Sequence, residues 1–153
     1  MDNLIRMLEE LWQIELEHNP NSEHFIEFQS SNAHFGNDEE FAIYLPGRKE
    51  IPFYSRGKSI ELAALACLYT YAPERIPKML SKSTNELAAG IRELIFLEGN
   101  LQRVKLSKNG HWECKIVGIR NNGEAGLGQT PLEAVRKLSK RLIRFGGEIL
   151  RQE

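Results

Sequence analysis

The chain has 153 residues, of which 41% are hydrophobic and 27% charged, and both fractions are near the averages of globular proteins. This composition excludes a disordered or fibrous protein, and the length allows one sizeable core or two small ones packed together. The longest apolar stretch, Ile60 to Tyr71, is too short to cross a bilayer, and the N-terminus lacks the basic region of a signal peptide. We therefore expect a cytoplasmic protein that does not contact membranes.

The net charge of −1 conceals an uneven distribution along the chain. Residues 1–61 carry twelve Asp and Glu against five Lys and Arg, whereas residues 62–153 carry nine against fifteen. Two explanations are open. Either the halves face each other electrostatically, or the basic half meets an anionic partner.

The first half has the pattern of a helix, three strands and a second helix, over residues 2–17, 24–29, 41–45, 51–55 and 60–71. Pro20 ends the first helix because proline disfavours the helical conformation in the residue before it. Pro52 lies in the third strand, which indicates the edge of a sheet. Ser59 is suited to cap the second helix.

The second half repeats this order, over residues 85–98, 101–106, 112–119, 124–127 and 131 onward. Thr84 is suited to cap its first helix. Lys108-Asn109-Gly110 and Asn121-Asn122-Gly123 are predicted hairpin turns, since Asn-Gly favours positive φ. Thr130 and Pro131 begin the last helix as the N-cap and the first helical residue.

An offset of 71 residues aligns the two halves, and it places Phe41 on Trp112, Gly47 on Gly118, Gly57 on Gly128, Ser59 on Thr130 and Ala63 on Ala134. We therefore predict an α+β fold of two tandem α-β-β-β-α units, each a three-stranded antiparallel sheet backed by helices. The first unit spans residues 1–72 and a connector spans residues 73–83. The second unit, packed on the first, spans residues 84–153.

Residues that could carry catalysis or bind a metal are scattered. Gly57-Lys58-Ser59 resembles the end of a phosphate-binding loop, but Pro52 replaces the glycine required five residues earlier. No nucleophile elbow is present, and metal-ligand spacing is absent among His18, His24, His34, His111, Cys67 and Cys114. The cysteines fit buried free thiols in a reducing compartment. We expect no enzymatic activity, no metal and no cofactor.

The last helix carries a continuous basic stripe. Its five cations fall within about 140° on a helical wheel, and they are Arg136, Lys137, Lys140, Arg141 and Arg144. Such a stripe beside an apolar face is suited to a phosphate backbone or another anionic partner. The alternative is a solvated face that pairs with the acidic first half.

The helix over residues 60–71 is apolar on nearly all sides. A helix of this kind must be covered all round. We expect it to lie between the two units or at the interface of a homodimer, with contacts from Ile60, Leu65, Leu68, Tyr69 and Tyr71.

The α-β-β-β-α order of each half resembles that of the double-stranded-RNA-binding domain. The segment Gly126 to Ala134 is similar to the glycine-rich entrance to that family's last helix. The lysine pair that holds phosphates there is replaced by Pro131-Leu132 in the second half and by Ile60-Glu61 in the first. The resemblance therefore implies the topology of that family but not its binding of RNA.

Residues 83–143 resemble the phage ABA-sandwich domain family, small α/β proteins of phages and prophages. The matching segments are Ser83-Thr84 with Ala88-Ala89, Leu101 to Leu106, Trp112-Glu113-Cys114, and Thr130 to Ala134. The resemblance implies a phage-encoded accessory protein in the cytoplasm of an infected or lysogenic bacterium.

Three functions are consistent with these features. The first is a non-catalytic phage accessory protein that binds a host macromolecule or a small anionic signal, for instance to counteract a host defence. The second is a nucleic-acid-binding module that uses the basic stripe. The third is a scaffolding or dimerisation protein that uses the helix over residues 60–71. Host protein and nucleic acid are accordingly the expected classes of partner.

Overall fold

The computed structural model describes residues 2–18, 23–30, 40–46, 53–77, 86–97, 102–117 and 124–152, with side chains to Leu142 in the last range. These residues form four α-helices, a 3-10 turn and one six-stranded sheet. In chain order the elements are α1 (Asn3–His18), β1 (Ile26–Ser30), β2 (Phe41–Leu45), β3 (Phe53–Gly57), α2 (Ile60–Tyr71), η1 (Pro73–Arg75), α3 (Glu86–Ile95), β4 (Arg103–Asn109), β5 (His111–Val117), β6 (Gly126–Gly128) and α4 (Pro131–Gln152). Each predicted helix and strand is present among the described residues, and the described bounds lie within three residues of the predicted ones. Pro52 and the predicted turn at Asn121-Asn122-Gly123 lie outside the described residues.

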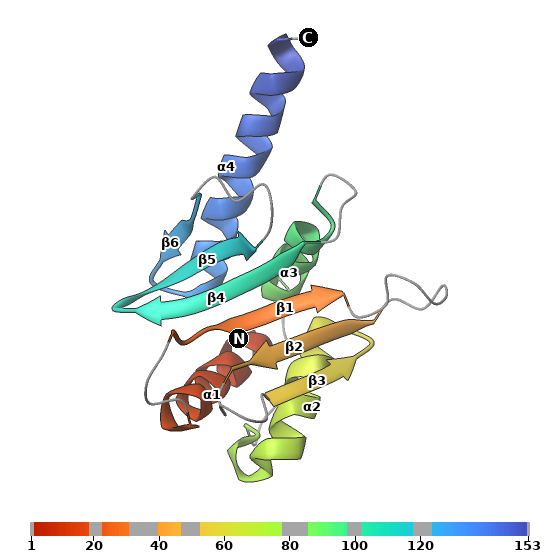
Figure 1. Cartoon of the computed structure of the whole chain (residues 1–153), viewed down its shortest axis with the longest axis vertical. Coiled ribbons are helices and arrows are strands. Elements are labelled where there is room, and N and C mark those ends of the chain that lie inside the picture. Colours follow the sequence, from red (N-terminus) through yellow and green to blue (C-terminus); the bar gives the residue numbers. More distant parts are fainter. Residues whose placement is uncertain are drawn as a thin grey trace.

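The sheet is antiparallel with strand order β3-β2-β1-β4-β5-β6 (Figure 1). The α+β class is confirmed, but the prediction of two separate three-stranded sheets was wrong. β1 pairs with β4, and Glu27 lies directly opposite Lys105. An unpaired strand edge is a ready template for another strand, so the first strand of each half closes the edge of the other. From either edge of the sheet toward its centre, the order is consequently the third, second and first strand of one half.

The helices form a single layer. In Figure 1 α1, α2, α3 and the first part of α4 lie behind the sheet, and the rest of α4 extends beyond its edge. No described helix covers the front face, which we call the open face. Residues on alternate positions of each strand point into the covered face, as Phe28, Val104 and Trp112 do. One hydrophobic cluster beneath the sheet contains side chains from both halves of the chain. None of the described helices is long and apolar enough to span a membrane.

The helix that ends each half begins in the same way. The N–H of Leu62 donates to Ser59 Oγ at 3.1 Å, and the N–H of Glu133 donates to Thr130 Oγ1 at 3.1 Å. The predicted N-caps Ser59 and Thr130 are therefore confirmed, whereas the third predicted cap, Thr84, lies outside the described residues.

Each of these helices also lies very close to the strand before it. A Cβ at Gly57 would stand 2.6 Å from the backbone nitrogen of Ala63, and a Cβ at Gly128 would stand 2.7 Å from that of Ala134. Only glycine permits this approach at either position. The aligned pair Gly47 and Gly118 lies outside the described residues.

The first helices of the two halves are joined at their N-termini. The carboxylate of Asp2 accepts the N–H of Leu4 in α1 at 2.9 Å and the N–H of Leu87 in α3 at 3.1 Å. Asp2 is buried. One negative group thus satisfies donors at two positive helix ends.

The charge asymmetry is partly resolved within the molecule. Three ion pairs join β4 of the basic half to the acidic half, and these are Lys105–Glu23 (3.0 Å), Arg103–Glu27 (3.9 Å) and Lys108–Glu9 (3.8 Å). The halves therefore do face each other electrostatically, at the β1–β4 seam and also between β4 and α1, which carries Glu9.

The sequence indicated that the helix over residues 60–71 is covered on all sides. In the structure, one side of α2 is exposed. Ile60 and Leu68 belong to the chain's own core and Leu65 is half-buried, but Tyr69 is 71% exposed and Tyr71 37%. Within the single chain α2 packs on β3, β2 and α1 through one side only, so the second unit does not complete its cover. The predicted homodimer interface stays a prediction.

Candidate binding surfaces

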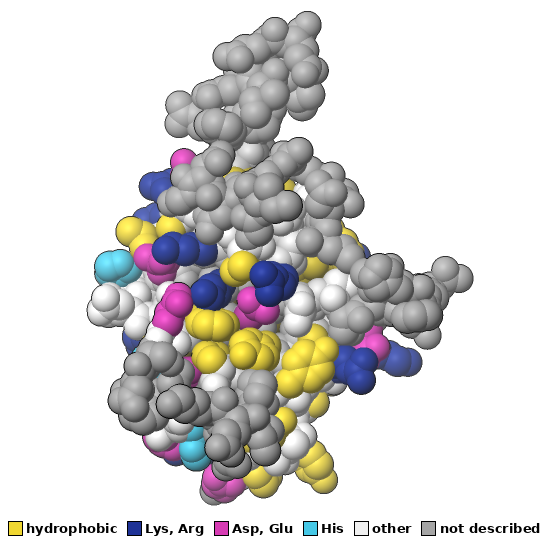
Figure 2. Space-filling view, viewed as in Figure 1, with side chains coloured by type: hydrophobic (Ala, Val, Ile, Leu, Met, Phe, Trp, Pro, Cys, Tyr) yellow, Lys and Arg dark blue, Asp and Glu magenta, His cyan; other side chains and the backbone are white. Residues whose placement is uncertain are grey.

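The open face of the sheet is the surface formed by Phe25, Glu27, Tyr44, Tyr54, Arg56, Arg103, Lys105, Ser107, Glu113, Lys115, Val117 and Leu127. These residues occupy the strand positions, and the residue just before β1, that alternate with the positions facing the helices, and Gln29 and Ala42 belong to the same face. Glu27 and Ala42 are themselves buried. Figure 2 shows this face, with hydrophobic side chains gathered over β1 to β3 and charged ones over β4 and β5.

Three aromatic side chains form a row across β1 to β3. Tyr44 and Tyr54 lie directly opposite each other on adjacent strands, and the Tyr44 ring is 6.0 Å from the Phe25 ring. Tyr54 is 41% exposed and the other two are half-buried. The row is thus a partly solvated apolar strip on a face that no described helix covers (Figure 1).

The β4 and β5 part of the open face is charged but balanced. Lys105 and Lys115 lie directly opposite each other on adjacent strands. Two like charges in this position repel each other. Lys115 Nζ lies 2.9 Å from a carboxylate oxygen of Glu113, and Lys105 Nζ lies 4.0 Å from the centre of the Phe25 ring. Together with the pairs that cross the seam, these contacts give each described cation of β4 and β5 on this face a carboxylate neighbour.

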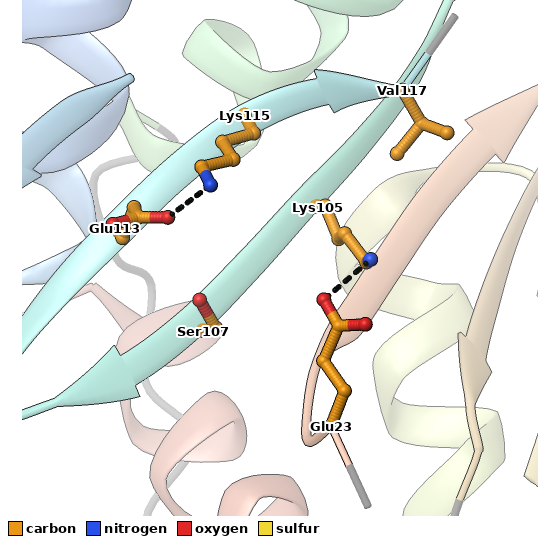
Figure 3. Close-up of a pocket in the computed structure, with 6 residues that line it drawn as sticks. All are labelled: Glu23, Lys105, Ser107, Glu113, Lys115 and Val117. Atoms are coloured by element: carbon orange, nitrogen blue, oxygen red, sulfur yellow. Dashed lines mark hydrogen bonds and ion pairs between the residues drawn. The ribbon is translucent and has the colours of Figure 1, made fainter. Parts of the chain in front are cut away.

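Between these charges lies a hollow of about 240 Å³, lined by Glu23, Lys105, Ser107, Glu113, Lys115 and Val117 (Figure 3). Lys105 forms an ion pair with Glu23, and Lys115 forms one with Glu113; both pairs are drawn as dashed lines in Figure 3. Within the described residues, the Ser107 hydroxyl has no hydrogen bond to a base that could activate it. The hollow therefore offers donors and acceptors for a polar group of a partner.

Glu27 lies at the centre of the open face and is largely buried. Burial raises the pKa of its carboxyl, and the neighbouring cations Arg103 and Lys105 lower it to a smaller extent. The two cations are thus partly committed to a carboxylate that is poorly solvated.

The basic stripe of α4 is largely paired. Arg136 contacts Glu86 at 3.0 Å, Lys137 contacts Glu133 at 3.1 Å, and Arg141 contacts Glu124 at 3.6 Å. These carboxylates belong to the second half of the chain, and not to the acidic first half.

Two members of the basic stripe differ from this pattern. Lys140 is exposed and has no ion pair among the described residues. Arg144 lies where only the backbone of α4 is described. The structure therefore places four of the five predicted cations on the surface of one helix, on the opposite layer from the open face.

Several of the remaining candidates make structural contacts, and His111 is the first residue of β5. Ser59 of the Gly57-Lys58-Ser59 segment is the N-cap of α2. His24 Nδ1 lies 3.6 Å from buried Glu15, the His18 ring is 5.4 Å from that of Phe53, and His34 lies outside the described residues. No group of three or more potential metal ligands occurs in the described part of the chain.

Both cysteines are free and buried, as predicted. Burial raises the pKa of the Cys67 thiol to about 12, an effect that a hydrogen bond with Ser55 reduces. Burial also raises the pKa of Cys114 to about 12. The thiolate is the reactive form, so neither side chain is prepared to act as a nucleophile at neutral pH.

The aromatic row was missed by the sequence analysis. The available signal was strand alternation, because Tyr44 stands between the core positions Ile43 and Leu45 and Tyr54 between Phe53 and Ser55. The neighbourhood of Phe25 and Lys105 had no local signal, because the pairing of β1 with β4 brings them together.

Comparison with protein-family models, with curated proteins and with solved structures finds no match to this chain in any of the three.

Proposed function

We propose that this protein is a non-catalytic, phage-type accessory protein that binds a host protein on the open face of its sheet (Figure 2). The observation that carries the proposal is the row of Phe25, Tyr44 and Tyr54 beside a polar hollow. Burial of such rings by a partner is favourable, and aromatic residues are enriched at the centres of protein interfaces. The resemblance of residues 83–143 to the phage ABA-sandwich domain supports the phage-type role, for which counter-defence in the bacterial cytoplasm is one form.

The charge of the open face favours a protein over a nucleic acid. Arg103, Lys105 and Lys115 have carboxylate neighbours, whereas Arg56 on β3 has no ion pair among the described residues. The face therefore has only a small excess of positive charge. A nucleic acid needs unpaired cations to replace the counterions of its phosphates. A protein partner, in contrast, can supply alternating charges that match those around the hollow.

Binding rather than catalysis is supported by the chemistry of the described nucleophiles. The thiols of Cys67 and Cys114 have pKa values raised to about 12. Glu113 lies opposite Ser107 but is paired with Lys115, and among the described residues the Ser107 hydroxyl has no hydrogen bond to a base.

The experiment compares the wild type and two variants as baits in lysate from a phage-host bacterium, and then measures the affinity of each for every purified candidate partner. Tyr44→Ala combined with Tyr54→Ala should weaken binding at least about 30-fold, as expected for loss of central aromatic anchors. Leu16→Ala is the matched control, because Leu16 on α1 is as exposed as Tyr54, at 41%. Its affinity should equal that of the wild type. Partners that bind the double variant and the wild type equally would overturn the assignment to the open face.

A second candidate function is nucleic-acid binding by the basic stripe of α4. The observation in its favour is that Lys140 is unpaired among the described residues and that the other pairs are solvent-exposed. Exposed pairs contribute at most about 1 kcal/mol, so phosphates could displace the carboxylates. A salt titration against duplex RNA, duplex DNA and single strands tests it. Affinity that falls steeply with salt, and is lost in Lys137→Glu with Arg141→Glu, would make this the leading function.

A further inference from the structure

The side of α2 that faces away from the sheet is an apolar stripe. Leu62 is 50% exposed and Tyr69 71% exposed, and the half-buried Leu65 and Ala66 lie between them. Residues three, four and seven positions apart share one side of a helix, so these four side chains form a continuous surface. We call it the α2 stripe.

The second half of the molecule provides an internal control for this stripe. The offset of 71 residues places the four positions of the α2 stripe on Glu133, Arg136, Lys137 and Lys140 of α4. Both helices start with the same cap and pack over a glycine of the preceding strand. The fold therefore accepts charged residues at these positions. Leu65 packs against the core, but the exposed Leu62 and Tyr69 need a cause other than folding of the single chain.

We propose that the α2 stripe is the contact surface between two copies of this chain, with the two α2 helices packed antiparallel about a twofold axis. The axis passes near Leu65 and Ala66, at the middle of the stripe. Leu62 then meets the partner subunit's Tyr69, and the small side chain of Ala66 lets the helices approach. The stripe is thus complementary to itself, as a twofold interface requires.

The charges at the two ends of α2 favour this arrangement. Lys58 precedes the helix and Glu74 follows it, at nearly equal separation in sequence from the middle of the stripe. Both are exposed, and neither has an ion pair among the described residues. Antiparallel packing brings Lys58 toward the partner subunit's Glu74, and it also aligns the helix dipoles favourably.

The expected dimer is weak and has a consequence for function. A stripe on one twelve-residue helix buries less than the area of about 800 Å² per partner that stable dimers use, so we expect micromolar dissociation. The α2 stripe lies on the helix layer, and the two open faces would therefore point away from each other (Figure 1). The dimer presents two binding faces, although its formation does not depend on what they bind.

Sedimentation of the full chain from low to several hundred micromolar concentration tests the proposal. The wild type should shift from monomer to dimer. Leu62→Glu combined with Tyr69→Lys gives α2 the charged residues that α4 carries at these positions, and it should remain monomeric with an unchanged unfolding midpoint. Lys140→Ala on α4 is the matched control and should dimerise as the wild type does. A wild type that stays monomeric throughout, or a double variant that dimerises equally, would overturn the proposal.

A charge exchange tests the antiparallel geometry separately from the apolar contact. Lys58→Glu should weaken dimerisation several-fold by opposing the partner subunit's Glu74, and Glu74→Lys in the same chain should restore it. Because both side chains are exposed, neither change should affect folding. Equal dissociation constants for Lys58→Glu and the wild type would contradict the antiparallel arrangement.

Discussion

The helices that end the two halves, α2 and α4, occupy equivalent places in the fold but present different surfaces. Each begins at a Ser or Thr cap and crosses a glycine of the strand beneath it. On the outer side α2 has Leu62 and Tyr69 where α4 has Glu133 and Lys140. The residues of both helices that contact the sheet are thus constrained by packing, whereas the residues on the outer side can vary and are available to bind a partner.

The halves also differ in how closely the last helix approaches its strand. A Cβ at Gly126 would lie 2.0 Å from the carbonyl oxygen of Ala134. The equivalent position in the first half is Ser55, which has a side chain and faces the small Cys67 where α4 has Leu138. The smaller helix residue leaves room that the second half does not have.

The largest effect that tests this difference is expected from Gly126→Ala. The added methyl group would collide with the backbone of α4, and overpacking against immobile atoms should cost at least about 3 kcal/mol of unfolding free energy. Urea denaturation measures the change. Leu127→Ala is the matched control, because Leu127 is 42% exposed on the same strand and should lose less than about 1 kcal/mol. Equal losses in the two variants would show that the approach of α4 is not tight.

A loss of intermediate size is expected from Asp2→Ala, which removes the one group shared by the first helices of both halves. Two buried N–H groups, those of Leu4 and Leu87, would lose their acceptor. The unfolding free energy should fall by about 2 kcal/mol. Asp2→Asn keeps one acceptor oxygen and should lie between alanine and wild type. A loss in Asp2→Ala no greater than that in Asp2→Asn would contradict the double cap.

The smallest effect concerns the first turn of α4. Hydrogen bonding to Lys137 and to the N–H of Gln129 lowers the pKa of Glu133 from its ordinary value of 4.5. Because this pKa is lower in the folded state, the ionised Glu133 carboxylate stabilises the fold above pH 4.5. This stabilisation is lost as the pH falls through the pKa of Glu133 in the folded protein. Leu62 occupies the equivalent position in α2, so only α4 should show this loss.

Amide hydrogen exchange at the two helix starts, measured at neutral pH and near pH 3, distinguishes the halves. Protection in the first turn of α4 should fall at acid pH relative to that of α2. Glu133→Gln should remove the difference in pH response. An acid-induced loss that persists in Glu133→Gln would assign the effect to another group.

Much of the local structure could be predicted, because it depends on neighbours in sequence. Asn109-Gly110 predicts a tight hairpin, and Gly110 has a φ of 76° between β4 and β5. Ser59 and Thr130 predict caps, and both make them. The basic stripe was also readable, since helical spacing alone places Arg136 and Lys140 on one side.

The open face could not be predicted in the same way. Its residues come from different strands, and Lys105 reaches the ring of Phe25 only because β4 lies next to β1. The pairing of Arg136 with Glu86 likewise joins two helices whose contact has no local sequence signal.

By itself the sequence determined the α+β class, the order of helices and strands, and the repeat at an offset of 71 residues. These follow from periodicity, caps and turns, which act over a few residues. Only the tertiary structure decided that β1 pairs with β4, that one sheet replaces two, and that α2 keeps an uncovered side. The physical reason is that strand pairing and burial depend on which distant surfaces exclude water together, and no local pattern specifies that choice.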